Sequence, residues 1–366
     1  MLKRRMARVA AAGLVGAAAL MMGVGPVSAH ERPRAPRVSD PIATGLAGPL
    51  QFEVSNRGDV LVAQSFSGVV SRITHWGQVK DLFSAPGVDG VAAGPFGSTI
   101  YTYTDHPETG QPQAQLKIRS WSGQVRTLAD LYAHEMTKNP DRRQTYGLMG
   151  LSAECAAQLP PDQGLLPYKG IVDSHPYAVT PVFGGVLVAD AGANAILFVN
   201  WRGHVSTVAV LPAQKPVPVS AEAAAANGLP PCVAGSSYVA EPVPTDVEVG
   251  RHGMLYVSTL PGGPEDPSLG ARGGVYSVNM WNGRTRQVAA GFAGAANLAV
   301  SPRGDIYVSE LFGNKVSKVV GNHGVTVANV PTPSGLEWSN GRLYAGINTF
   351  GPEEAPPDGQ IVTIKP

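Results

Sequence analysis

The feature of this chain that most constrains its fold is a short unit that occurs six times. Each copy has a tight turn centred on glycine and then a short apolar strand, as in Arg57-Gly58-Asp59 before Val60-Leu61-Val62. The copies lie at 56–62, 96–101, 184–188, 251–257, 302–308 and 340–344. Glycine supplies the positive φ that such hairpin turns require. A unit that recurs in this way is typical of a repeat architecture, in which neighbouring units bury one another's apolar faces.

A second tight turn follows in most copies, at 76–79, 121–125, 201–205, 281–284 and 322–325. Four of these turns begin with tryptophan: Trp76, Trp121, Trp201 and Trp281. Such a ring can pack on the neighbouring repeat, or it can stay exposed as a ligand platform. We expect packing, because an aromatic ring gains much from burial.

Two turns and their flanking strands give each repeat four antiparallel strands, A to D. The sequence therefore predicts an all-β, six-bladed β-propeller over residues 40–366. The last repeat ends at 360–364 without a fourth strand, whereas a spare strand at 41–46 precedes the first repeat. Pairing these two segments closes the ring and removes both free sheet edges. Helical signals are confined to 129–138 and 221–226.

The first 29 residues have the organisation of a secretory signal. Cations at positions 3–8 precede an apolar run at 9–24 and the small-residue motif Val27-Ser28-Ala29, so we expect cleavage after Ala29 and a secreted, extracytoplasmic protein. Arg4-Arg5 leaves the twin-arginine route open. Residues 30–39 are rich in Pro and Arg and predict a disordered lead-in. No other apolar stretch is long enough to span a bilayer.

The charge of the chain argues against a nucleic-acid partner. Lys and Arg number 28 against 27 Asp and Glu, and removal of the cationic leader leaves a slightly acidic remainder. Only 15% of residues are charged, against about 25% in an average protein. A protein that binds phosphate backbones needs a basic stripe, and none is evident. We expect a monomer.

The two cysteines, Cys155 and Cys232, favour one disulfide in an exported protein. Two free thiols or a metal site are the alternatives, although neither cysteine has a histidine cluster beside it.

All the long insertions fall on one side of the predicted propeller. The A–B and C–D turns of a propeller lie on one face, here called the turn face, and the B–C and D–A connections lie on the other, the loop face. The long segments are 103–115, 130–173, 211–243, 260–273 and 348–359, and all of them are B–C or D–A connections. Loops of this length are usually functional or disordered. We therefore expect a small molecule, a glycan or a protein to bind at the loop face.

Polar residues near this face and the channel mouth form the hypothetical ligand site. They are Gln51, Asp89, Asp173, His175, Asp190, Asn194, Thr245, Asp246, Asn297 and Glu310. Among the loop-face histidines, only His175 stands at the start of a strand A. Each of these residues also has a structural interpretation. His175 can cap the start of its strand, and Asp190 can bond its own loop as an Asx turn.

Oxygen-bearing side chains recur on the innermost strands. Asp246, Glu248, Asn297, Glu53 and Glu337 would suit Ca²⁺, which takes six to eight oxygen ligands. The alternative is that these side chains bond backbone and water inside the channel. We expect no cofactor, with Ca²⁺ as the one candidate.

Complete catalytic motifs are missing. The chain has no Gly-x-Ser-x-Gly elbow, no His-Glu-x-x-His helix and no phosphate-cradling loop. The local pairs of Asp173 with His175 and of Asp105 with His106 are weakly specific. No catalytic residue is assigned on these grounds.

The strand B pattern resembles NHL-type propeller repeats. Longer features narrow the resemblance: Pro176-Tyr177-Ala178-Val179, Val188-Ala189-Asp190-Ala191-Gly192-Ala193-Asn194 and Pro244-Thr245-Asp246-Val247. With Asp130-Leu131 and Asn139-Pro140-Asp141, these resemble the ScyD/ScyE family of secreted bacterial propellers over about residues 40–365. His175 departs from the small polar residue expected there. The resemblance implies a propeller fold and export, and it implies no reaction.

Two functions follow from these observations. The first is a secreted binding or scaffold protein of the ScyD/ScyE type that uses the loop face and is not an enzyme. The alternative is a Ca²⁺-dependent hydrolase or lactonase with its site at the channel mouth.

Overall fold

The structure is a computed structural model, and it describes residues 37–366 except 108–109, 162, 265–266 and 352–355. The chain divides into two units, Met1–Ala35 and Pro36–Pro366. The predicted signal sequence and residues 30–36 of the predicted lead-in lie outside the described residues.

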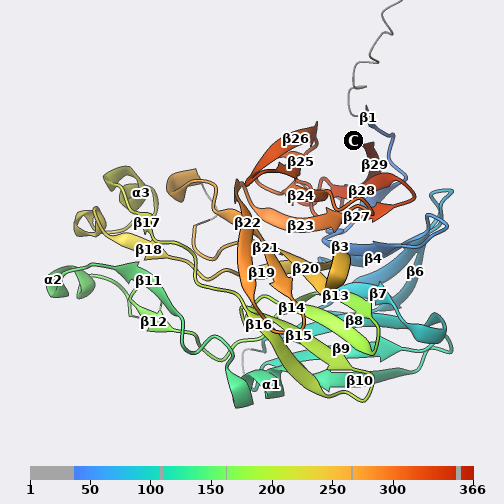
Figure 1. The fold of residues 1–366 in the computed structure, drawn as a ribbon, viewed down its shortest axis with the longest axis horizontal. Coiled ribbons are helices and arrows are strands. Elements are labelled where there is room, and N and C mark those ends of the chain that lie inside the picture. Colours follow the sequence, from blue (N-terminus) through green and yellow to red (C-terminus); the bar gives the residue numbers. More distant parts are fainter. Residues whose placement is uncertain (1–36, 108–109, 162, 265–266, 352–355) are drawn as a thin grey trace, which may run out of the picture. The chain divides into compact units, whose positions relative to one another are not determined.

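Six antiparallel sheets, here called blades 1 to 6, follow one another along the chain (Figure 1). Five of them have four strands, and the last has five because two N-terminal strands join it. In five of them the strand order is the chain order. Blade 1 contains β3 (Gln51–Val54), β4 (Val60–Gln64), β5 (Val69–Ile73) and β6 (Val79–Ser84). Blade 2 contains β7 (Val91–Ala93), β8 (Thr99–Asp105), β9 (Gln113–Arg119) and β10 (Val125–Asp130). Blade 3 contains β13 (Pro176–Val182), β14 (Gly185–Asp190), β15 (Ala195–Asn200) and β16 (Val205–Val210).

The remaining blades repeat the pattern. Blade 4 contains β19 (Pro244–Val249), β20 (Met254–Thr259), β21 (Gly273–Asn279) and β22 (Thr285–Phe292). Blade 5 contains β23 (Ala295–Val300), β24 (Ile306–Glu310), β25 (Lys315–Val320) and β26 (His323–Asn329). Blade 6 contains β27 (Leu336–Ser339), β28 (Arg342–Ile347) and β29 (Gly359–Lys365), joined by β1 (Arg37–Val38) and β2 (Ala43–Leu46).

The innermost strands contact one another in a closed cycle. Strand β3 contacts β7, β7 contacts β13, and the series continues through β19, β23 and β27 back to β3. The predicted β-propeller fold is confirmed, and the cycle is the arrangement expected for six blades.

The N-terminal strands complete the last blade. Strand β2 pairs antiparallel with β29, with Ala43 opposite Ile361, as the spare-strand argument predicted. Strand β1 also pairs with β29, placing Arg37 opposite Lys365. The predicted disordered lead-in is therefore wrong for Arg37 and Val38, because their backbone groups bond the edge of this sheet.

The two longest insertions combine into a seventh sheet, which the sequence did not predict. Its strand order is β12-β11-β18-β17, with β11 (Thr145–Met149) and β12 (Tyr168–Lys169) from the first insertion, and β17 (Val217–Pro218) and β18 (Ser237–Val239) from the second. The helices α1 (Leu131–Lys138), α2 (Ala153–Ala156) and α3 (Ala221–Ala226) flank these strands in the sequence. The predicted disulfide between Cys155 and Cys232 is present and links the two insertions.

Short 3₁₀ segments occupy four turns or loops: η1 (Pro95–Gly97), η2 (Pro231–Val233), η3 (Arg251–Gly253) and η4 (Pro267–Leu269). Within the part of the chain that the structure describes, no helix is long and apolar enough to cross a membrane.

The core lies between neighbouring blades. Every residue of β14 is buried, because a sheet in the ring is covered on both faces and its central strands read as continuous apolar runs. Side chains from blades 2 and 3 and from α1, such as Leu116, Val188 and Leu131, share one apolar cluster. Burial of such surface contributes about 25 cal/mol per Å².

The packing expected of the turn tryptophans is wrong for three of the four. Trp76, Trp121 and Trp281 are 85%, 80% and 78% exposed, and only Trp201 packs against a core cluster. At the turns of Trp76 and Trp281 the backbone makes the contact instead, since a Cβ added at Gly77 or Gly283 would come within 2.5 Å of a carbonyl oxygen of a neighbouring segment. At these two turns the glycine packs against the neighbour and the ring stays exposed.

Candidate functional site

The loop face holds a histidine–aspartate pair at the mouth of the central channel. His175 precedes β13 in blade 3, and Asp89 precedes β7 in blade 2. The Nε2 atom of His175 lies 2.7 Å from Oδ2 of Asp89. Their side chains are 40% and 15% exposed, so solvent or a substrate can reach the imidazole. Among the described residues the Nδ1 atom has no hydrogen-bond partner, which leaves it open for proton transfer.

Buried groups hold both partners in place. Asp190 accepts a 2.7 Å hydrogen bond from the His175 backbone N–H and a 2.6 Å bond from the Ser174 hydroxyl. On the other side, the Thr102 hydroxyl oxygen accepts from the backbone N–H groups of Asp89 and Gly90. The pair is therefore positioned by the strand ends of two blades, a rigid support for a reactive group.

Tyr177 lies beside this pair because of a β-bulge. The register between β13 and β14 shifts between Pro176 and Ala178, so Tyr177 is the extra residue. Bulges re-aim side chains at rims and next to active sites. The Tyr177 and His175 rings lie 6.0 Å apart between centroids, and the Tyr177 hydroxyl has no hydrogen-bond partner among the described residues. His106, from the β8–β9 loop, approaches His175 with 6.4 Å between ring centroids.

The charges around the pair shift its protonation. Burial alone would lower the pKa of His175, but the hydrogen bond to Asp89 and the charges of Asp89, Asp190 and Asp173 outweigh it, so the pKa is raised above its usual value. Burial, with the charges of Asp89 and Asp246, also raises the pKa of Tyr177 far above its usual range. At neutral pH the Tyr177 hydroxyl is therefore a proton donor and carries no charge.

A belt of amide hydrogen bonds links the innermost strands of blades 1, 4, 5 and 6. Gln51 of blade 1 donates to the Thr245 carbonyl of blade 4 at 2.9 Å and accepts from Asn297 of blade 5 at 2.8 Å. Asn297 in turn accepts from the backbone N–H of Leu336. Three of the predicted ligand-binding residues, Gln51, Thr245 and Asn297, are therefore together as expected, but they bond one another.

Asp246 is committed in the same way. Its two oxygens accept from the backbone N–H groups of Val247 and Leu298. Burial raises its pKa to about 7. Burial and neighbouring carboxylates raise the pKa of Glu248, two residues further along β19, and of Glu337 on β27 of blade 6. Burial also raises the pKa of Glu53, whose carboxylate accepts from the backbone N–H of Ala93.

These side chains do not fit the predicted calcium site. Both carboxylate oxygens of Asp246, the amide oxygen of Asn297 and one carboxylate oxygen of Glu53 already accept hydrogen bonds from backbone N–H groups. Within the described residues, no group of three or more His, Cys, Asp or Glu side chains could hold a metal ion. The alternative interpretation, that these oxygens bond backbone, describes this arrangement better.

Two predicted ligand residues at the ends of the B strands hold the start of strand A. Asp190 bonds His175 as described and also the backbone N–H of Ala193. Glu310 accepts from the backbone N–H of Ala293 and from the Ser317 hydroxyl. Gln64 bonds the Ala47 N–H in the same place in blade 1. Only the Asp190–Ala193 bond is the Asx-type contact within its own loop that the sequence left open.

Asn194 lies away from the channel mouth, in a buried network beneath the insertions. Its side-chain N–H groups donate to Asp141 and Glu241 at 2.9 Å each, and its oxygen accepts from the Val243 backbone. Asp141 also accepts from the Tyr146 hydroxyl. The network ties blade 3 to both insertions.

Glu135 of α1 is a titratable group to which the sequence pattern assigned no role at the site. It is 1% exposed, and neither carboxylate oxygen has a partner that meets hydrogen-bond geometry. Burial, with the charges of Asp190, Asp141 and Asp173, raises its pKa to about 8. The charge of Asp173 acts on both Glu135 and His175, whereas the ion pair of His175 is with Asp89.

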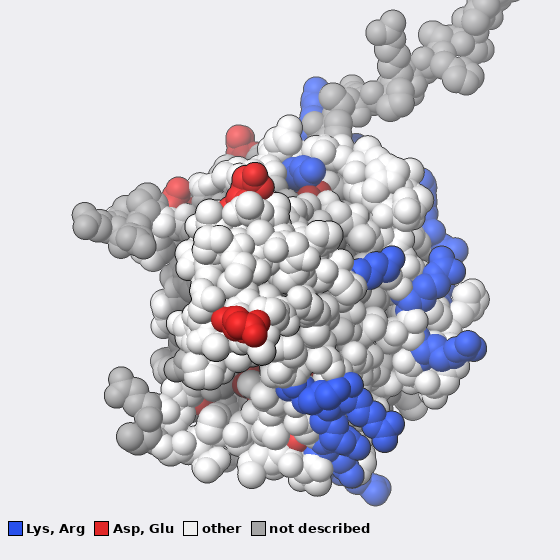
Figure 2. Space-filling view, turned by 90° about the vertical axis from the view of Figure 1, so that its left-hand side faces the viewer, with Lys and Arg blue, Asp and Glu red and all other residues white. Residues whose placement is uncertain are grey.

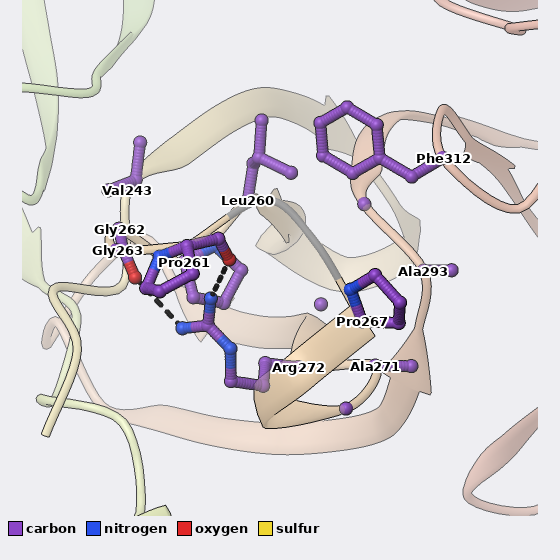
Figure 3. A pocket seen from close by; sticks show the side chains of 14 residues that line it. Val243, Leu260, Pro261, Gly262, Gly263, Pro267, Ala271, Arg272, Ala293 and Phe312 are labelled. Carbon is purple, nitrogen blue, oxygen red and sulfur yellow. Dashed lines mark hydrogen bonds between the residues drawn. The ribbon is translucent and has the colours of Figure 1, made fainter. Parts of the chain in front are cut away.

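A separate cavity of about 460 Å³ opens on the loop face between blades 4 and 5, shown in Figure 3. Val243, Leu260 and Phe312 give it an apolar wall. The guanidinium of Arg272 donates to the carbonyls of Gly262 and Pro264, and so braces the loop. His175 and Asp89 are not part of its described lining. The cavity can hold a ligand, whereas the His175–Asp89 pair can transfer a proton.

Sequence reasoning named His175 and Asp89 but did not connect them, because 86 positions separate the two residues. The local Asp173–His175 pair was considered instead. Tyr177 and Glu135 were missed. Tyr177 is the extra residue of the bulge between β13 and β14. This bulge is defined by the pairing register of the two strands, so the sequence alone does not reveal it.

No protein-family model and no curated protein matches this chain. Solved structures match over most of its length. A putative oxidoreductase (glucose dehydrogenase) from Thermus thermophilus is 16% identical, covers 90% of this chain and 100% of its own, and has a TM-score of 0.56. The PQQ-bound aldose sugar dehydrogenase from Streptomyces coelicolor is 12% identical, with coverages of 90% and 97% and a TM-score of 0.53. A putative gluconolactonase is 14% identical, with coverages of 90% and 91% and a TM-score of 0.50.

These comparisons correct one expectation and leave another without support. The named structures are called dehydrogenases and a lactonase, which overturns the expectation of a chain that is not an enzyme. At this identity the likeness shows the β-propeller fold and not the reaction. None of the matches supports the ScyD/ScyE family in particular.

Proposed function

We propose that the chain is a propeller enzyme that hydrolyses a small ester or lactone at the mouth of the central channel. The observation that carries this proposal is the His175–Asp89 pair, with an open Nδ1 atom and with the Tyr177 ring 6.0 Å from the imidazole between centroids. A general base, a group that orients it and a neutral donor for an oxyanion are the parts that acyl hydrolysis needs. The enzyme names of the matched propellers agree with a catalytic role, and the gluconolactonase name agrees with the substrate class.

The chemistry follows from the positions of the side chains. The Nε2–H of His175 donates to Asp89, so the lone pair is on Nδ1. Nδ1 removes a proton from a water molecule as that water attacks the acyl carbon of the substrate. The Tyr177 hydroxyl donates a hydrogen bond to the developing oxyanion. As the tetrahedral intermediate collapses, the imidazolium returns its proton to the departing alkoxide, so proton and charge balance.

Electrostatics restrict the substrate. Asp89, Asp173 and Asp246 stand around the channel mouth, and their field disfavours anionic substrates. A neutral ester or lactone avoids that repulsion.

The test is a hydrolysis assay on a panel of nitrophenyl esters, aliphatic lactones and sugar lactones, run with EDTA and with added Ca²⁺. We expect turnover of at least one neutral substrate. His175→Gln should lower kcat/KM by about 10²–10⁴-fold, and Tyr177→Phe by about 10–100-fold. His204→Gln is the matched control, since this exposed histidine lies at the C–D turn of blade 3 on the turn face.

Three outcomes would contradict the proposal. The first is no hydrolysis of any panel member by a folded protein. The second is full activity in His175→Gln. The third is sugar oxidation with added PQQ and an electron acceptor in place of hydrolysis, which would assign the chain a redox reaction.

A further inference from the structure

The turn face carries an arc of protruding aromatic side chains. Trp76, Phe96, Trp121, Phe183 and Trp281 stand at its tight turns in blades 1 to 4, and each is at least 78% exposed. Phe96 and Phe183 are 97% exposed and fully exposed. Large rings scattered singly on a surface are normal, whereas several on one face mark an interaction site. None of them contributes to the core.

Phe96 occupies a backbone conformation that is unfavourable for its type. Its φ is +56°, in the left-handed region, and the next residue, Gly97, has a φ of +73°. Asn or Gly is the default at such a turn, and a bulky residue there is a true outlier. Retention of strain at an exposed tip indicates a use for the ring outside folding.

Exposed arginines alternate with these rings. Arg57, Arg126, Arg202 and Arg284 lie at or beside the same turns in blades 1 to 4, and none makes an ion pair with a described carboxylate. The acidic residues of the tight turns, Asp59 and Asp305, are already paired with Arg72 and Lys318. Figure 2 shows Lys and Arg side chains gathered toward one side of that view, apart from most of the acidic side chains.

The arc includes an apolar groove. Phe96, Ile118, Trp121 and Trp201 line a hollow of about 1080 Å³ between blades 2 and 3, and Arg126 lies at its edge. Apolar contact beside a cation matches the two parts of a phospholipid, its acyl region and its phosphate.

We propose that the turn face docks on the surface of an anionic phospholipid bilayer, with the rings at the level of the headgroups. Charge complementarity selects a negative partner, and interfacial aromatic rings favour a fluid headgroup layer. The rings project outward, so a rigid polymer could surround them only if it had matching pockets, whereas lipids rearrange around them. This orientation leaves the loop face, with His175, open to the medium.

The test measures sedimentation of the purified protein with vesicles of phosphatidylcholine, with and without one-third phosphatidylglycerol. We expect binding to the anionic vesicles that weakens with added salt, together with a blue shift of tryptophan emission. Loss of Trp121 in Trp121→Ser should lower partitioning about tenfold. Arg202→Glu together with Arg284→Glu should lower it more than tenfold, at about fivefold for each cation lost.

Phe96→Asn separates this role from folding. It removes the strain at the turn, so thermal stability should stay the same or rise while vesicle binding falls. Phe66→Ser is the matched control, because it removes an exposed ring from the B–C turn of blade 1 on the loop face.

Any of three results would overturn the proposal. These are no binding to anionic vesicles at low salt, equal loss of binding in Phe66→Ser, and retention by a soluble anionic polysaccharide or a nucleic acid without vesicle binding. The last result would assign the face to a polymer.

Discussion

The Asp89 carboxylate sets both the orientation and the protonation of His175. Its hydrogen bond and charge raise the pKa of the imidazole against the effect of burial. In the proposed mechanism the neutral imidazole is the active form. The rate therefore rises with pH through the pKa of His175, which lies above its ordinary value of 6.5.

In Asp89→Asn the pKa of His175 should fall, because burial remains and the opposing carboxylate is gone. The acidic limb of kcat/KM should move to lower pH, and its plateau should drop by about tenfold or more, since the ring is no longer held. A pH–rate profile of both proteins measures this. An unchanged limb would show that His175 does not govern the rate.

Glu135 makes folding stability depend on pH. Its folded-state pKa of about 8 lies above the unfolded value of 4.5, so the folded chain binds more protons between these values and stability falls as pH rises through that window. Glu135→Gln stays neutral at every pH. We expect its Tm to fall less than that of the parent protein between pH 6 and pH 9, by a few degrees.

Calorimetry across this pH range provides the comparison, and Glu222→Gln is its control. Glu222 is an exposed residue of α3, so its removal should leave the slope unchanged. Equal slopes in the parent and Glu135→Gln would mean that the buried carboxyl does not titrate in this window.

At the scale of elements, the insertion sheet and its disulfide form a small unit beside the blades. Cys155 of α2 packs with Leu148, Ala223 and Val233 in a cluster of its own, and the bond to Cys232 closes a separation of 77 residues. A loop of this length predicts a stabilisation of about 4 kcal/mol by the chain-entropy model. Most of that effect should fall on the insertions.

In a Cys155→Ser, Cys232→Ser double variant we expect the insertions to open locally while the blades stay folded. Limited proteolysis should cut near residues 150–165 or 225–236 first, before the main thermal transition. A single cooperative transition with no early cuts would show instead that the insertions and the blades unfold as one.

At the scale of the whole molecule, the ring depends on β2. Leu46 is 1% exposed and Ala43 is 5% exposed, and both pack in one cluster with Ile73 of blade 1 and Ile361 of blade 6. Without β1 and β2, the outer side of β29 is a free edge, the template on which sheets aggregate.

Removal of residues 37–46 should therefore lower Tm and increase aggregation. Loss of two buried side chains alone costs several kcal/mol. Scattering and calorimetry compare the protein with and without these residues. A truncated chain that remains monomeric with an unchanged Tm would show that the ring closes without these strands.

The sequence by itself determined the repeat and therefore the fold, because glycine turns and apolar strands are local patterns that recur at readable positions. It also placed the long loops on one face, paired the two cysteines and located His175 and Asp89 separately. The tertiary structure decided which polar groups are free to act. Six polar residues that the sequence predicts to bind a ligand each bond a partner from another strand, loop or blade instead. They are Gln51, Asp190, Asn194, Asp246, Asn297 and Glu310. Three features arise only when the blades pack together: the hydrogen bonds between distant segments, the bulge at Tyr177 and the glycine contact beside Trp76. They depend on residues far apart in the sequence, so no local pattern predicts them.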